Sequence, residues 1–130
     1  MFLAIIGLAF TLILFQDVAS AQTKEQTAAE LASQQADKLA DLLELEGWQV
    51  FYVDSILTAN YLSLQAGFAD LSAKKVSNRD IYQDLQYSKL DEIYYALEKV
   101  FDESQWAKYL KRGAAKDKKS REKYFAKKNK

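Results

Sequence analysis

The stretch Val100–Leu110, which reads VFDESQWAKYL, contains the sequence pattern of a helix start. Asp102 is placed to accept a hydrogen bond from the backbone N–H of Gln105, and Gln105 is placed to accept one from the backbone N–H of Asp102, which together make a capping box. Phe101 and Trp106 flank the cap at the spacing of a hydrophobic staple. The pattern predicts that a helix begins directly after Asp102.

Two earlier stretches divide the rest of the chain in the same way. Residues 76–81 (VSNRDI) place Ser77 as an N-cap with Asp80 as its reciprocal partner, and residues 45–50 (LEGWQV) form a weaker copy. Between these starts, apolar residues recur at spacings of three and four, which is typical of amphipathic helices. The predicted helices before Asp102 cover Gln22–Leu45, Trp48–Lys75 and Asn78–Val100.

The composition supports an all-α fold. The 130 residues include no Pro and only four Gly, so the usual turn residues of β folds are scarce. The break between the second and third helices is short, which predicts that they form a long antiparallel hairpin. Gly67 interrupts the pattern of the second helix and predicts either a close helix crossing or a bend. The expected fold is therefore about four helices followed by a charged C-terminal tail.

The N-terminus predicts export. Met1–Phe15 is apolar and uncharged but shorter than the roughly 17–25 residues of a membrane span. It is followed by Ala19-Ser20-Ala21, an A-x-A cleavage site, although no basic residue precedes Lys24. We predict a signal peptide over 1–21 and a mature periplasmic or secreted protein. The alternative is an uncleaved segment that anchors the protein in a membrane.

The remaining chain has two poles of opposite charge. Lys111–Lys130 contains ten Lys/Arg against two acidic residues, a net charge of +8, whereas Gln22–Leu110 contains eight Lys/Arg against fifteen acidic residues, a net charge of −7. We therefore divide the chain into a signal peptide (1–21), a helical domain (22–112) and a basic helical or disordered tail (113–130).

Such a tail attracts polyanions such as acidic lipid, lipopolysaccharide or an acidic protein patch, and nucleic acid is not expected for an exported chain. The candidate polyanion-binding residues are Lys111, Arg112, Lys116, Lys118, Lys119, Arg121, Lys123, Lys127 and Lys128.

Catalytic chemistry has little support in this sequence. The chain contains no Cys and no His, which excludes Cys nucleophiles, Ser–His pairs and His/Cys metal sites. It has no Gly-rich phosphate loop, and the adjacent carboxylates Asp91-Glu92 and Asp102-Glu103 do not share a helix face. We expect a protein that is not an enzyme and that has no cofactor or metal.

Aromatic residues supply both core and contact candidates. Four tyrosines lie at the flanks of the apolar faces and are the candidates for an exposed protein-binding surface. These are Tyr52, Tyr82, Tyr95 and Tyr109. The aromatic residues assigned to the core are Trp48, Phe51, Tyr61, Phe68, Tyr87, Tyr94, Phe101 and Trp106.

Two of the helix starts also resemble a family motif. Phe101–Gln105 is similar to the L-T-x-x-Q motif of the Spy/CpxP family of periplasmic proteins, and Leu45–Gln49 keeps its Leu and Gln at the same spacing. The Thr position holds Asp102 in one copy and Glu46 in the other. The resemblance covers about residues 39–112. It implies a bent, all-helical homodimer that holds non-native proteins without ATP, or that senses envelope stress.

The sequence therefore favours an exported helical protein-binding module of chaperone-like or envelope-stress type. Its expected partners are non-native or envelope proteins and a second copy of the chain. The alternative is a structural or adaptor protein that binds an envelope polyanion through its basic tail.

Overall fold

The computed structural model describes residues 26–129, and the predicted signal peptide lies outside this range. The described chain is all-helical, as predicted, and contains no strand. Its elements run in the order α2 (Ala28–Leu43), α3 (Gly47–Ala73), α4 (Arg79–Val100), α5 (Glu103–Tyr109), the short π-helical turn η1 (Leu110–Ala114) and α6 (Ala115–Lys128). None of the helices within residues 26–129 is both long and apolar enough to cross a membrane.

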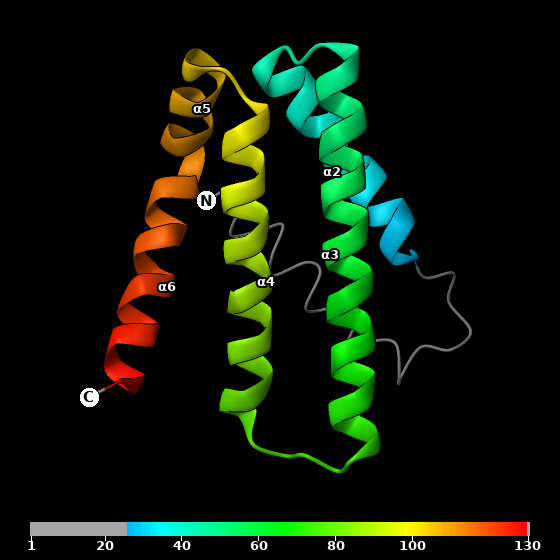
Figure 1. Ribbon diagram of the computed structural model, residues 1–130, viewed down its shortest axis with the longest axis vertical. Helices are drawn as coiled ribbons and strands as arrows, with labels where there is room; N and C mark the ends of the chain where they lie inside the picture. The colour runs from blue at the N-terminus through cyan, green and yellow to red at the C-terminus, as the bar shows by residue number, and fades with distance from the viewer. Residues whose placement is uncertain (1–25, 130) are drawn as a thin grey trace.

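The helices are arranged around α3 and α4, which lie side by side and run in opposite directions (Figure 1). Helix α2 packs against the first half of α3. On the other side of α4, the chain returns through α5 and α6, so that α3 and α6 flank α4. The first turn of α3 and the first turn of α5 therefore meet at one end of the molecule.

The helix starts explain where these elements begin. Asp102 and Gln105 form the predicted capping box, because the Gln105 N–H donates to Asp102 Oδ1 at 2.8 Å and the Asp102 N–H donates to Gln105 Oε1 at 2.9 Å. The staple rings of Phe101 and Trp106 are in contact, with centroids 6.3 Å apart. These contacts confirm the predicted start of α5.

The predicted cap of the third helix is wrong by one residue. Asn78, not Ser77, is the N-cap of α4, and its Oδ1 accepts from the Asp80 N–H at 2.9 Å. The Asn carboxamide reaches this N–H while its own backbone stays extended, so the helix begins at Arg79.

The buried core occupies only one half of the α3–α4 pair. Its apolar side chains come from α2, from α3 up to Leu64, from α4 from Ile93 onwards, and from the α5–η1 segment. No residue from 65 to 92 is buried. The far half of α3 and α4 is therefore held by partly buried contacts alone.

Two glycines shape the packing. A Cβ on Gly67 would lie 2.6 Å from Leu85 Cδ2, so Gly67 marks the close approach of α3 and α4 that was one of its two predicted roles. Gly113 has φ of 128°, a conformation that favours glycine, and it kinks the chain within η1, between α5 and α6. This kink turns α6 along the side of α4.

Candidate functional site

The first turns of α3 and α5 are joined by a pair of side-chain amides. Gln49 Nε2 donates to Gln105 Oε1 at 2.6 Å, and Gln105 Nε2 donates back to Gln49 Oε1 at 3.1 Å. Each glutamine is the third residue of its own helix. The reciprocal contact therefore connects the two helix starts that the sequence analysis identified as related.

Each amide also satisfies backbone groups at these helix starts. The Glu46 N–H donates to Gln49 Oε1 at 2.8 Å, and Gln49 Nε2 donates to the Val100 carbonyl at 3.1 Å. Gln49 is only 2% exposed. A buried amide needs such partners, since an unpaired polar group would be costly. The glutamine pair is a structural junction and offers no free group for chemistry.

The outer side of α3 is an exposed apolar surface. Its buried residues recur at spacings of three and four on the side that faces α2 and α4. The opposite side carries what we call the outer stripe, which consists of Trp48, Phe51, Tyr52, Ser55, Ala59, Leu62, Ala66 and Ala69, all exposed. Along α3, which the structure describes completely, no exposed residue before Asp70 is charged. At 1.5 Å per residue this uncharged surface is about 30 Å long.

The aromatic end of the outer stripe contradicts part of the predicted core. Trp48 is 53% exposed and Phe51 is 66% exposed, whereas both were assigned to the core. Tyr52 connects them, with ring centroids 6.1 Å from Trp48 and 5.6 Å from Phe51 in edge-to-face contacts. The reason is that the residues of α3 buried against its neighbours, such as Val53, lie on the opposite side of the helix, which leaves these three rings largely exposed.

The structure separates the four tyrosines proposed as protein contacts. Tyr52 and Tyr95 are exposed, but Tyr52 lies on the outer stripe whereas Tyr95 lies on α4 beside Lys118. Tyr82 is half-buried and its hydroxyl donates to the Val76 carbonyl at 2.7 Å.

The assignment of Tyr109 to an exposed surface is wrong. Tyr109 is 6% exposed, because its ring packs between Phe101 and Trp106 at centroid distances of 5.5 and 5.4 Å. This burial raises the pKa of its hydroxyl. The contact surface therefore cannot include Tyr109.

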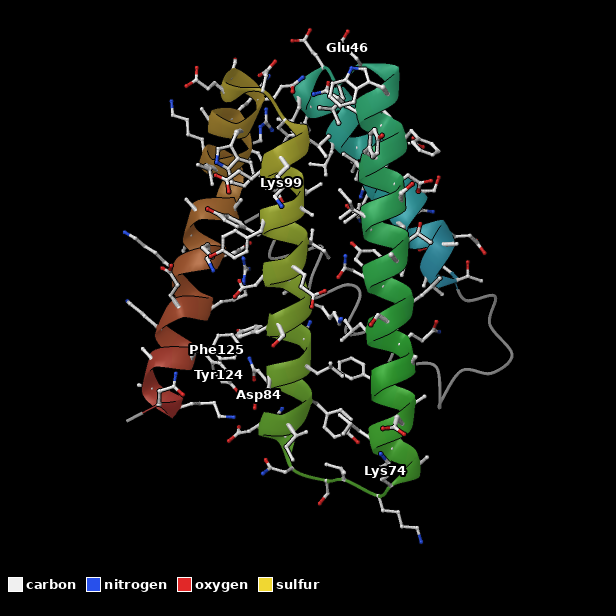
Figure 2. The ribbon with its side chains drawn as sticks, viewed as in Figure 1. Glu46, Lys74, Asp84, Lys99, Tyr124 and Phe125 are labelled. Atoms are coloured by element: carbon white, nitrogen blue, oxygen red, sulfur yellow. The ribbon has the colours of Figure 1, made fainter. Side chains whose placement is uncertain are left out.

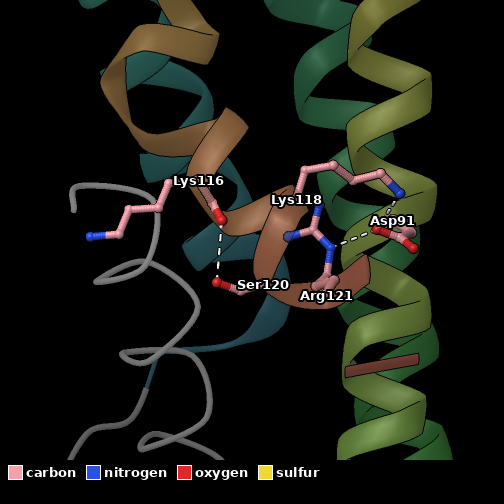
Figure 3. A network of polar contacts seen from close by, with 5 residues as sticks. All are labelled: Asp91, Lys116, Lys118, Ser120 and Arg121. Atoms are coloured by element: carbon pink, nitrogen blue, oxygen red, sulfur yellow. Dashed lines mark hydrogen bonds and ion pairs between the residues drawn. The ribbon is translucent and has the colours of Figure 1, made fainter. Parts of the chain in front are cut away.

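The basic C-terminal segment forms a helix that is bound to α4 by ion pairs. Arg121 Nε lies 2.6 Å from Asp91 Oδ1, and Lys118 Nζ lies 3.2 Å from the same oxygen (Figure 3). Burial acts to lower the pKa of Lys118, but its hydrogen bonds with Tyr95 and Asp91 outweigh this and raise it. Lys118 also lies over the Tyr95 ring, 4.6 Å from its centroid, a cation–π contact.

A second polar contact holds the far end of α6. The Tyr124 hydroxyl donates to Asp84 Oδ1 at 2.7 Å (Figure 2). Lys128 pairs with the other oxygen of Asp84. These two hydrogen bonds hold the pKa of Asp84 below its ordinary value. Desolvation and the bond to Asp84 raise the pKa of Tyr124 to about 12. The Tyr124 ring meets Tyr87 edge to face at 5.0 Å, and Phe125 lies 6.4 Å from the same ring.

The structure divides the nine candidate polyanion-binding residues into two groups. Lys118, Arg121 and Lys128 face α4 and are paired with its carboxylates, although Lys128 is itself partly exposed. The members with no ion pair to α4 within residues 26–129 are all exposed: Lys111 and Arg112 in η1, and Lys116, Lys119, Lys123 and Lys127 in α6.

Residues 26–129 were also searched for a metal centre. No group of three or more Asp, Glu, His or Cys side chains in this range is placed to hold a metal ion. An open hollow lies between α3 and α4, and its lining includes Gly67, Asp70, Leu71, Ile81 and Leu85. Comparison of the chain with protein-family models, with curated proteins and with solved structures finds no match. The exposed side chains form two candidate surfaces, the outer stripe of α3 and the row of Lys116, Lys119, Lys123 and Lys127 on α6.

Proposed function

We propose that this protein is an exported binding module that holds apolar segments of non-native proteins on the outer stripe of α3. The observation that carries the proposal is the exposed ring cluster Trp48, Phe51 and Tyr52, continued by Leu62 along the same side of the helix. Water-exposed apolar surface of this extent is typical of interaction sites on soluble proteins.

The shape of the outer stripe favours loose, general binding. It is a convex helix face rather than a pocket, and it carries no charge that would select one partner. Rings at one end and small side chains (Ser55, Ala59, Ala66) along the rest offer apolar contact to many sequences. Such a surface suits partners that expose apolar segments only while they are unfolded, and the binding requires no nucleotide.

Two further observations support the chaperone-like character. The predicted signal peptide over 1–21 would place the protein in the periplasm or outside the cell, where ATP-independent binding is needed. Phe101–Gln105 and Leu45–Gln49 resemble the L-T-x-x-Q motif of the Spy/CpxP family, and their glutamines are in contact. A shared role of the two motif copies in joining α3 to α5 is consistent with that resemblance.

The test is suppression of aggregation. A client enzyme diluted from denaturant is followed by light scattering, with and without an excess of the purified protein and without nucleotide. We expect the wild type to delay aggregation. A variant with Trp48→Ser, Phe51→Ser and Leu62→Ser should lose most of this protection, because the outer stripe then lacks its large apolar groups.

The matched control replaces an exposed apolar residue outside the outer stripe. Ile81→Ser removes an exposed apolar group from α4 and should leave protection unchanged. Circular dichroism checks that both variants keep their helices. Protection that is equal in the wild type and the stripe variant would contradict the proposal.

A further inference from the structure

We propose that α6 is a two-faced helix. Its four outer lysines (Lys116, Lys119, Lys123 and Lys127) bind the surface of an anionic phospholipid bilayer, while its inner cations (Lys118, Arg121 and Lys128) hold it on α4. This function is independent of the outer stripe of α3. The partner is identified by its chemistry, a plane of phosphate-bearing headgroups, and the contact is electrostatic.

The first step is the separation of the cations of α6 by side of the helix. Lys118, Arg121 and Lys128 are used within the molecule by Asp91 and Asp84. Lys116, Lys119, Lys123 and Lys127 are exposed and follow one another at spacings of three, four and four, which places them on one side of α6. Figure 3 shows Lys116 on the opposite side of α6 from Asp91. The outer lysines are therefore a continuous row of positive charge.

The second step is the shape of this row. On a helix of 100° per residue, the four lysines fall within a sector of about 80°. Small exposed residues (Ala115, Ser120 and Ala126) accompany them, so the ammonium groups can reach a common plane, and exposed Glu122 lies at the edge of the row. A helix in a nucleic-acid groove meets phosphates on both walls, which would favour cations over a wider sector. A narrow row matches a flat surface.

The third step is the chemistry of the side chains. All four outer residues are lysines, which act as point charges, whereas the one arginine of α6 forms the internal pair with Asp91. The rings of Tyr124 and Phe125 face Tyr87 on α4, so the outer face has no aromatic group for stacking on bases or for insertion among lipid chains. Binding on this face must therefore be sensitive to salt.

The rest of the molecule supports one orientation on such a surface. Residues 22–110 carry a net charge of −7, so an anionic surface repels the body and attracts only the α6 side. Helix α3 lies on the opposite side of α4 from α6 (Figure 1). A molecule bound through its outer lysines keeps the outer stripe of α3 away from the bilayer.

The experiment measures binding of the full chain to vesicles by co-sedimentation. Vesicles of phosphatidylcholine with phosphatidylserine are compared with vesicles of phosphatidylcholine alone, which report any contribution of the apolar segment Met1–Phe15. We expect an excess of binding to the anionic vesicles at low salt. The excess should disappear near 1 M salt, where the Debye length is about 3 Å. Each lysine near such a surface contributes about fivefold in affinity, so replacing all four by Gln should reduce the excess by about two orders of magnitude or more.

The matched control removes the same charge elsewhere. Lys74→Gln, Arg79→Gln, Lys99→Gln and Lys108→Gln change exposed residues outside α6 and should retain most of the excess binding. Replacing the four outer lysines by Arg should also retain it. Equal binding of the wild type and the outer Gln variant would overturn the proposal, as would tighter binding to duplex DNA than to anionic vesicles at equal phosphate concentration. Loss of client protection in the stripe variant of α3 tests only the proposed binding of non-native proteins. It does not bear on the binding of α6 to vesicles.

Discussion

Gln49 and Gln105 exchange two amide hydrogen bonds although they are 56 residues apart in the sequence. Each side-chain oxygen accepts from the backbone N–H of the N-cap residue of its own helix. Each side-chain nitrogen donates to the other glutamine. The hydrogen bonding at the start of α3 is therefore incomplete until α5 has folded beside it. This arrangement explains how a chain with no Cys holds the start of α3 and the end of α4 against α5.

The glutamine pair should be a major determinant of stability. Gln49→Ala removes the acceptor of the Glu46 N–H and one hydrogen-bond partner each of Gln105 and the Val100 carbonyl, in partly buried contacts. We expect a loss of about 1–3 kcal/mol in the free energy of unfolding, measured by chemical denaturation. Gln34→Ala, on the exposed side of α2, is the control and should change stability by less than about 0.5 kcal/mol.

A double-mutant cycle tests whether the two amides act together. Gln49→Ala and Gln105→Ala should be non-additive by about 0.5–3 kcal/mol, as is usual for residues in one hydrogen-bond network. Strict additivity would show that the contact between the two helix starts is of no energetic importance.

The two tryptophans should respond differently to truncation. Trp106 packs against Tyr94 at 5.0 Å and against Tyr109 at 5.4 Å, whereas Trp48 lies on the outer stripe. Trp106→Ala should cost about 3 kcal/mol in the free energy of unfolding, because it opens a space among aromatic rings. Trp48→Ala should cost no more than about 0.5 kcal/mol. The measurement is thermal unfolding of both variants. A larger loss of stability in Trp48→Ala than in Trp106→Ala would contradict this assignment.

Adjacent acidic residues on α4 offer a direct test of the α6 contact. Asp91 accepts from Arg121 and Lys118, whereas Glu92 makes only an exposed pair with Lys89. Asp91→Asn should destabilise the protein by about 1.5–3 kcal/mol, near the lower limit because the carboxylate is 24% exposed.

Glu92→Gln is the matched control and should have an effect of about 0–1 kcal/mol. Limited trypsin digestion then shows whether α6 separates from α4, since its lysines become better substrates once the helix is released. Equal cleavage rates for the two variants would show that Asp91 does not hold α6.

The contact between Tyr124 and Asp84 should be lost at both ends of the pH range. The pKa of Tyr124 is raised to about 12, so its contribution to stability is fully present below pH 10 and disappears as the pH rises towards 12. The pKa of Asp84 is lowered, so its contribution is present above the ordinary value of 3.8 and is lost as the pH falls below it.

The measurement is the ultraviolet titration of tyrosinate. Tyr61 also titrates late, with a pKa raised to about 12 by burial. Asp84→Asn should lower the pKa of Tyr124 back towards 10 and leave the pKa of Tyr61 unchanged. An unaltered titration curve in Asp84→Asn would show that the carboxylate does not affect Tyr124.

The helices were predictable because their starts and periodicities are local. The capping box at Asp102 and the staple of Phe101 with Trp106 depend on residues within one turn. The start of α4 was misplaced by one residue because Ser77 and Asn78 are both good caps, and backbone geometry decides between them.

The surfaces were harder to predict because they depend on which helix covers which face. Apolar residues surround α3 on all sides, so its sequence does not tell which side α2 leaves open, and Trp48 and Phe51 were assigned to the core. The basic segment gave no indication of its own that Arg121 is neutralised, because its partner Asp91 is 30 residues away on α4. The presence of apolar residues on all sides of one helix in so small a protein was the available signal of an exposed binding face.

The uneven placement of the core has a consequence for motion. Because no residue from 65 to 92 is buried, opening of the far half of α3 and α4 exposes little new apolar surface. Amide hydrogens there should exchange with solvent through local, partial unfolding, while those beside Val53 and Leu97 exchange only when the whole domain unfolds. The molecule then behaves as two regions of different stability, a slow-exchanging end built on the glutamine junction and a fast-exchanging end fastened by α6.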